Sequence, residues 1–128
     1  MSYLDHFGDQ RAAAIHLAVL RVLEVDLLFR DASVTAAKVA AMLGETPQAI
    51  SASLAKRTGE NFSTLLARLR ITEAQRLLSQ PKKAELTLEE IGMLAGFSSR
   101  QTFYAAFQKH VGMTPKQYRQ QVLCKASN

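Results

Sequence analysis

Two glycines divide the last third of the chain into short capped segments, and this spacing restricts the fold more than any other feature. Gly96 follows the apolar run that begins at Ile91, and Gly112 follows a longer run that ends at Val111. Glycine readily adopts the positive φ angles that end helices and turn the chain. A short helix, a glycine turn and a second helix predict a helix-turn-helix unit, with a third helix that starts at Pro115 behind it.

Start and stop signals of the same kind run along the whole chain. Capping residues such as Asp9, Thr35, Thr46 and Ser98 precede apolar runs, and Thr87 with Glu90 has the spacing of a capping box. No run alternates apolar and polar residues as a strand does, so we expect an all-α fold. The expected helices span about 10–30, 36–43, 47–58, 62–79, 88–95, 99–111 and 115–122.

The first expected helix is apolar around more than half of its circumference, with Ile15, Leu20 and Val25 on different sides. A helix of this kind needs cover on more than one side. The simpler interpretation is a core helix of the first half of the chain. The alternative is that one side forms a dimerisation or partner face.

The pattern of caps, glycines and apolar residues occurs twice. The expected helix over 62–79 joins the two copies, and two matched helix-turn-helix units favour DNA binding far more than one does. Small residues in the first helix of each copy indicate a close helix crossing. The matched pairs are Thr35/Thr87, Ala40/Gly92, Gly44/Gly96 and Thr46/Ser98 at an offset of 52, then Ile50/Phe103, Leu54/Phe107 and Gly59/Gly112 at 53.

Charge is distributed unevenly along a basic chain. The net charge is +5 and the pI about 9.7, which points to nucleic acid or another anionic partner. Residues 1–31 contain five acidic residues and three arginines, whereas residues 96–128 contain no acidic residue. This asymmetry favours a basic binding face in the second half of the chain.

Other classes of function find no support in the sequence. His6, His16 and His110 lack ligand spacing, so we expect no metal. No catalytic triad, phosphate-binding loop or dinucleotide motif is present, so we expect neither catalysis nor a cofactor. Charged residues interrupt the apolar stretch over 12–29, which therefore does not resemble a membrane span. With Cys124 as the single cysteine, these features predict a cytoplasmic protein without membrane contact.

The second half of the chain resembles the DNA-binding domain of the AraC/XylS family of bacterial transcription regulators. The similarity extends over about 15–120 and includes the stretch 70–74 with Leu77 and Leu78 in the joining helix. The residues of the second half that carry it are Ile91, Gly96, Phe97, Phe103, Phe107, Lys109, Gly112, Thr114, Pro115, Tyr118 and Arg119.

The resemblance implies seven helices in two helix-turn-helix lobes joined by a long linker helix. The second helix of each lobe would enter a major groove. A linker of about 18 residues is about 27 Å long, which suits two grooves one DNA turn apart. The resemblance also implies RNA polymerase as a partner if the protein is an activator. Regulators of this family usually join the DNA-binding domain to a sensing or dimerisation domain, so we expect the chain to be either a stand-alone short regulator or a C-terminal module of a longer one. The alternative function is a protein-interaction module that kept the fold with little DNA affinity.

This organisation divides the chain into five expected parts. They are an N-terminal extension (1–9), a first helix-turn-helix lobe (10–60), the linker helix (61–80), a second helix-turn-helix lobe (81–122) and a C-terminal tail (123–128).

Candidate DNA-contacting residues follow from these helices. Arginine can bind guanine and glutamine can bind adenine, each through two hydrogen bonds. The candidate base-reading residues are Ser99, Arg100, Gln101, Thr102 and Tyr104 in the second lobe and Gln48 and Ser51 in the first. The candidate phosphate contacts, which position the protein on the duplex, are Thr46, Lys56, Arg57, Lys109, Thr114, Lys116 and Arg119. The family commonly carries arginine where this chain has Ala52 and Ala105, so we expect the second lobe to supply most of the specificity.

Overall fold

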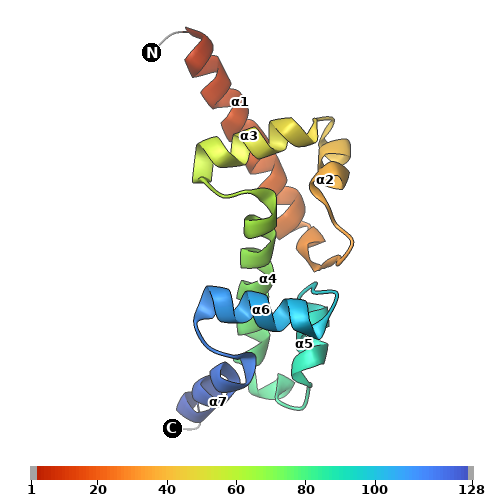
Figure 1. Cartoon of the computed structure of the whole chain (residues 1–128), viewed down its shortest axis with the longest axis vertical. Helices are drawn as coiled ribbons and strands as arrows, with labels where there is room; N and C mark the ends of the chain where they lie inside the picture. The colour runs from red at the N-terminus through yellow and green to blue at the C-terminus, as the bar shows by residue number, and fades with distance from the viewer. Residues whose placement is uncertain (1–2, 127–128) are drawn as a thin grey trace. The chain divides into compact units, whose positions relative to one another are not determined.

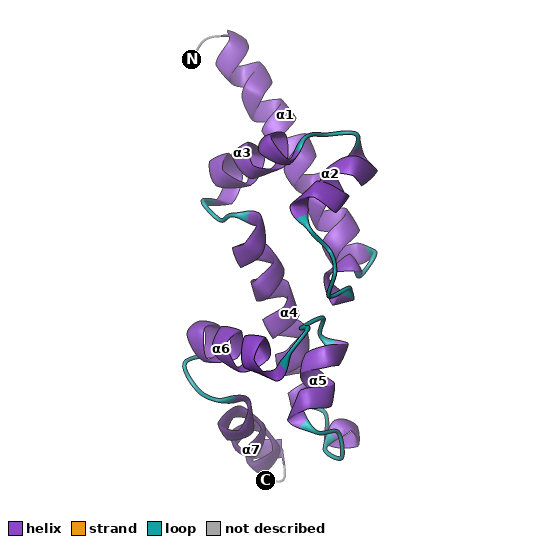
Figure 2. Cartoon of the chain, turned by 45° about the vertical axis from the view of Figure 1, so that its right-hand side comes forward, coloured by secondary structure: helices purple, strands orange, loops and turns teal. Residues whose placement is uncertain are grey.

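The computed structural model describes residues 3–126, and the side chains of residues 8–125. Seven α-helices and short connections make up this part of the chain, which contains no strand, as expected (Figures 1 and 2). The helices are α1 (Tyr3–Leu20), α2 (Ala36–Leu43), α3 (Pro47–Thr58), α4 (Phe62–Leu78), α5 (Leu88–Leu94), α6 (Arg100–Val111) and α7 (Pro115–Ala126). None of these described helices is long and apolar enough to cross a membrane.

The chain divides into two compact units, and the division falls within α4. The first unit contains the chain up to Leu28 and then Val34–Leu66. The second contains the short segment Phe29–Ser33 and the chain from Ala67 onward. The expected division with a separate linker helix remains a prediction. Residues 1–2 and 127–128 of the expected extension and tail lie outside the described residues, as does the His6 side chain.

The expected first helix is wrong at both ends. Helix α1 begins at Tyr3, so Asp9 lies within it and pairs with Lys56 instead of capping a helix start. The α-helix ends at Leu20, a π-helical turn follows, and Leu27 takes a positive φ of 62°. This break separates α1 from Phe29, which is buried in the second unit.

Two further boundaries differ from expectation. Ser99, not Ser98, caps α6, since its hydroxyl accepts a hydrogen bond from the Thr102 backbone N–H. The residue that changes the repeat offset from 52 to 53 therefore lies in the turn after Gly96. Helix α7 continues to Ala126, beyond the expected end near Val122. The caps Thr35, Thr46 and Thr87 are confirmed, as is the turn at Gly112, while Asn61 caps α4.

The first unit packs α1 and α2 against α3 around an apolar core. Ile15, Val19 and Leu23 are buried, which supports a core role for this face of the first helix. Leu17 and Val25 are 67% and 72% exposed, so these two apolar residues of the segment lack cover. The other buried apolar residues of the unit are Ala12, Val22, Val34, Val39, Ala40, Ile50, Leu54, Phe62, Leu65 and Leu66.

The second unit is built around aromatic residues, as the sequence predicts for its phenylalanines. Phe103 lies 5.3 Å from Phe97 and 5.8 Å from Phe107, measured between ring centroids, and Phe107 lies 5.5 Å from Tyr118. Ring pairs at these distances are favourable beyond the area that they bury. The buried core also contains Ile71, Ala74, Leu77, Leu78, Ile91 and Ala95.

Helix α4 holds Phe29–Ser33 in the second unit through polar contacts. Arg70 donates from Nε to the Phe29 carbonyl at 2.8 Å and from Nη2 to the Asp31 carbonyl at 2.9 Å. Glu73, which is 7% exposed, accepts hydrogen bonds from Arg76 at 2.5 Å and from Arg30. The hydrogen bond from Arg76, with that from Arg30, lowers the pKa of Glu73 although burial opposes it. The segment is thus fixed to α4 by charged hydrogen bonds.

Candidate nucleic-acid interface

Helix α6 has one buried face and one polar face. Phe103 and Phe107 are fully buried, and Gln101, Ala105 and Gln108 lie on the opposite, exposed side. Within the part of the chain that the structure describes, the Gln101 and Gln108 side chains form no hydrogen bond. Both amides are therefore available to an external partner.

Sequence reasoning overlooked Gln108. It follows Gln101 by seven residues, which is two helical turns and places both residues on the same face. This seven-residue spacing is present in the sequence and is the signal that identifies Gln108 as a candidate. Its counterpart in α3 is Ala55, which is also exposed.

The first turn of α6 positions several of the candidate base-reading residues. The hydroxyls of Ser99 and Thr102 share a hydrogen bond of 2.6 Å, and both side chains are exposed. The Arg100 guanidinium lies 4.9 Å from the centroid of the Tyr104 ring, a cation–π contact that limits the freedom of both side chains. These residues thus form two separate pairs, Ser99 with Thr102 and Arg100 with Tyr104, and the hydroxyl pair has already used part of its hydrogen-bonding capacity.

Helix α3 presents a smaller set of polar groups. Gln48 and Ser51 are exposed, as are Ala52 and Ala55. The Thr46 hydroxyl accepts a hydrogen bond from the Ala49 backbone N–H at 3.1 Å, so this residue acts first as the helix cap. Gln48 is the only exposed candidate of α3 with a side-chain amide, and it occupies the repeat position of Gln101 at the offset of 53.

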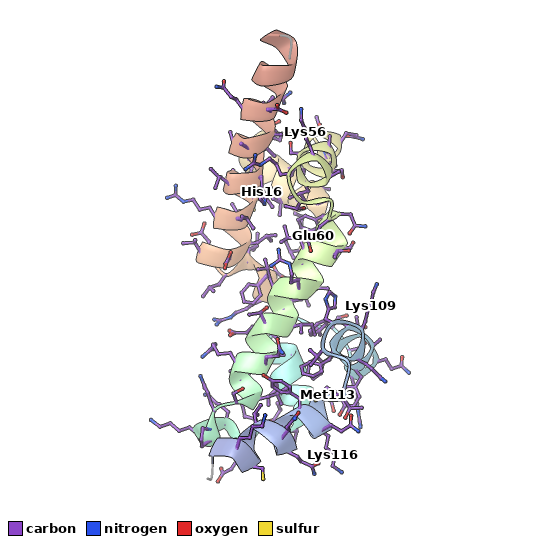
Figure 3. The ribbon with its side chains drawn as sticks, turned by 90° about the vertical axis from the view of Figure 1, so that its left-hand side faces the viewer. His16, Lys56, Glu60, Lys109, Met113 and Lys116 are labelled. Carbon is purple, nitrogen blue, oxygen red and sulfur yellow. The ribbon has the colours of Figure 1, made fainter. Side chains whose placement is uncertain are left out.

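The candidate phosphate contacts fall into two groups. Among described residues, Arg57, Lys109 and Lys116 are exposed and form no ion pair. Figure 3 shows Lys109 on α6 and Lys116 on α7. In contrast, Lys56 pairs with Asp9 at 2.5 Å. Arg119 donates from Nη1 to the Leu86 carbonyl at 2.6 Å. The first three cations are therefore the ones free to meet phosphate.

The start of α7 is a second capping box. The Thr114 hydroxyl accepts from the Gln117 N–H at 3.1 Å, and Gln117 Oε1 accepts from the Thr114 N–H at 3.0 Å. Because Pro115 has no N–H, Lys116 provides the remaining N–H of the first turn without an intrahelical acceptor. An anion at this helix start would thus meet the backbone and side chain of Lys116 together.

Comparison with known proteins identifies relatives of one kind. A family model described as a helix-turn-helix domain matches residues 39–121. The melibiose operon regulatory protein of Escherichia coli K12 is 45% identical over 51 residues, which cover 40% of this chain and 16% of that protein. The HTH-type transcriptional activator RhaR of Enterobacter sp. strain 638 is 40% identical over 63 residues, 49% of this chain and 21% of RhaR. The chain thus spans about a fifth of the length of these relatives or less.

Solved structures of similar fold cover more of the chain. The C-terminal domain of AraT, a response regulator from Geobacillus stearothermophilus, superposes with a TM-score of 0.67 at 27% identity, over 94% of this chain and 88% of that one. An AraC-type regulator from Chromobacterium violaceum shares the fold with a TM-score of 0.66 at 24% identity, over 77% and 87%. With the family match over 39–121, these findings show that the chain belongs to the AraC-type helix-turn-helix family of DNA-binding transcription regulators.

Proposed function

We propose that the chain binds double-stranded DNA sequence-specifically, as the DNA-binding part of a cytoplasmic bacterial transcription regulator. Helices α3 and α6 act as recognition helices that enter successive major grooves. The observation that carries this proposal is the duplicated capped helix pair, whose second helices each present an exposed face, with at least one glutamine, opposite a buried one. A helix of this kind fits the major groove and can read base edges there.

Side chains have separate tasks in this proposal. The base-reading residues of the second unit are Ser99, which caps α6, and Arg100, Gln101, Thr102, Tyr104 and Gln108 on α6. Those of the first unit are Gln48 and Ser51 on α3. Arg57, Lys109 and Lys116 contact phosphates, together with the helix starts at Thr46 and Thr114. Lys56 and Arg119 contribute their charge while they hold Asp9 and the Leu86 carbonyl.

The chain's partners extend beyond DNA. RNA polymerase is the expected partner if the protein activates transcription, as the relative RhaR is described to do. A sensing or dimerisation domain is a further expected partner, since the region matched in these relatives is only about a fifth of their length or less.

The salt dependence of binding tests this function. Proteins that neutralise phosphates release counterions, so the logarithm of the binding constant falls with the logarithm of salt by about 0.9 per phosphate contact. We expect duplex binding to weaken steeply as salt rises in a gel-shift titration. Lys109→Gln and Lys116→Gln should each reduce the slope by about 0.9, whereas the control Lys82→Gln, in the turn after α4, should not. Absence of duplex binding at low salt would favour the protein-interaction module instead.

The division of labour between the two recognition helices is tested separately. Helix α6 offers two free amides and an arginine, whereas α3 offers one amide, so we expect α6 to supply most of the specificity. Binding of Arg100→Ala and Gln48→Ala to a library of duplex sites compares them directly. A larger loss of base preference in Gln48→Ala than in Arg100→Ala would contradict this expectation.

A further inference from the structure

We infer that the bases read by the outward faces of α6 and α3, opposite their buried residues, are chiefly A·T pairs, a preference that rests on the proposed function and deepens it. The inference comes from the outward strip of each helix, at the positions opposite the buried residues. On α6 the strip consists of Gln101, Ala105 and Gln108, and on α3 of Gln48, Ala52 and Ala55. We call these the readout strips.

The glutamines of α6 select adenine. In the major groove, the NH₂ group of a glutamine side chain can donate to adenine N7 while its amide oxygen accepts from the adenine N6 amino group. Gln101 and Gln108 are exposed on one face, and their amides form no hydrogen bond within the described residues. They are about 10.5 Å apart along the helix axis, which is about three base-pair steps. One helix can therefore read two separate adenines.

The alanines fit thymine. Ala105 lies between the two glutamines on the exposed face, and its methyl group is the only group that it can offer to a base. In the major groove, alanine suits contact with the C5-methyl of thymine. A cytosine at the same place has no methyl group and leaves the alanine without that contact. An alanine between two glutamines thus fits a run of A·T pairs.

The first unit carries the same chemistry. Gln48 occupies the repeat position of Gln101, and Ala52 occupies that of Ala105. Ala55 replaces the second glutamine by another methyl group. Neither strip contains arginine or lysine, which are the usual donors to guanine, or an acid, which would accept from cytosine. Arg100 stands outside the strip, at the first residue of α6, with its guanidinium against Tyr104.

Selection of sites from random duplex DNA, with the full chain, is the first test. We expect A·T pairs where the readout strips of α6 and α3 meet the bases. Gln101→Ala and Gln108→Ala should each weaken binding to the selected site by about 5- to 150-fold and remove the preference at one pair. Gln120→Ala, an exposed glutamine of α7, serves as the control and should leave the preference unchanged.

Deoxyuridine then tests the methyl contacts, because it differs from thymidine only by the missing C5-methyl. Replacing a contacted thymine should weaken wild-type binding by about fourfold. Ala105→Arg should exchange the A·T preference at one pair for G·C. Selection of G·C pairs by the wild-type strips, or binding without base preference, would overturn the inference while DNA binding stands. Failure to retain any duplex would instead overturn the proposed function.

Discussion

At the scale of single residues, the two units pack the first helix of the helix-turn-helix against the second with different pairs of residues. In the second unit, a Cβ added to Gly92 would lie 2.6 Å from Cδ2 of Phe103, closer than such contacts can be. In the first unit the corresponding residues are Ala40 and Ile50, both buried. The large Phe103 ring on α6 therefore requires the small Gly92 on α5. The two units thus share a close contact between their helices, although the residues that make it differ.

This complementarity predicts the effect of Gly92→Ala. The added methyl must displace a fully buried ring, so we expect a loss of about 1–3 kcal/mol in the free energy of unfolding. Combining it with Phe103→Ile, which recreates the Ala–Ile pair of the first unit, should reduce the cost of the added methyl. A double-mutant cycle from urea denaturation measures this coupling. Equal costs in both backgrounds would show that the ring does not set the size of residue 92.

At the scale of elements, α4 holds the segment Phe29–Ser33 in place through polar contacts. It binds the backbone of Phe29–Ser33 through Arg70 and orders Arg30 through Glu73. Burial lowers the pKa of Arg70, with Asp31 opposing that change. The close approach of Gly96 to the Phe29 carbonyl allows this segment to lie against the helix-turn-helix turn, since a Cβ there would lie 2.4 Å from that oxygen. The segment therefore depends on both α4 and the turn.

Glu73 makes this arrangement pH-dependent. Its pKa is lowered in the folded chain, first by the hydrogen bond from Arg76. The stabilisation is therefore fully present above the unfolded pKa of about 4.3 and is lost as the pH falls through the folded value. Glu73→Gln should cost about 1–3 kcal/mol at pH 7, and the difference from wild type should shrink in acid.

The measurement is denaturant unfolding of wild type and Glu73→Gln at several pH values. Glu85→Gln is the matched control, because Glu85 is exposed and forms no interaction with the described residues. A cost of Glu73→Gln that stays constant from pH 7 into the acid range would exclude the carboxylate as its source.

At the scale of the whole molecule, the chain contains two cores, one in each unit. The repeat pair Leu54 and Phe107 belongs to these cores, one residue in each, and both side chains are fully buried. Because each helix-turn-helix has its own buried residues, local opening of one core need not open the other.

Truncation of each member of this pair tests the independence of the cores. Phe107→Ala should cost about 3–5 kcal/mol and lower the amide hydrogen-exchange protection of α5, α6 and α7 more than that of α1, α2 and α3. Leu54→Ala should show the opposite distribution, at a cost of about 2–5 kcal/mol. A uniform loss of protection along the chain in both variants would indicate a single cooperative unit.

The sequence by itself determined the helices, most of their caps and the two repeated units. Thr35, Thr46 and Thr87 cap helices through backbone groups three residues away, and Gly44 and Gly112 take positive φ where the pattern placed them. These signals are local, so a short stretch of sequence contains both partners. The buried phenylalanines were equally clear, because their spacing matches the helical period.

Only the tertiary structure decided which partners Lys56 and Arg119 have and where the first helix ends. Asp9 meets Lys56 from 47 residues away, and Arg119 meets the Leu86 carbonyl across 33 residues. The helix expected to reach Arg30 breaks at Leu27, and Phe29 packs in the other unit. Composition and periodicity contain no information on such partners, because they depend on how distant segments fold together. The readout strips depend on both the sequence and the tertiary structure. Helical spacing in the sequence defines their residues, and the folded chain leaves those residues exposed.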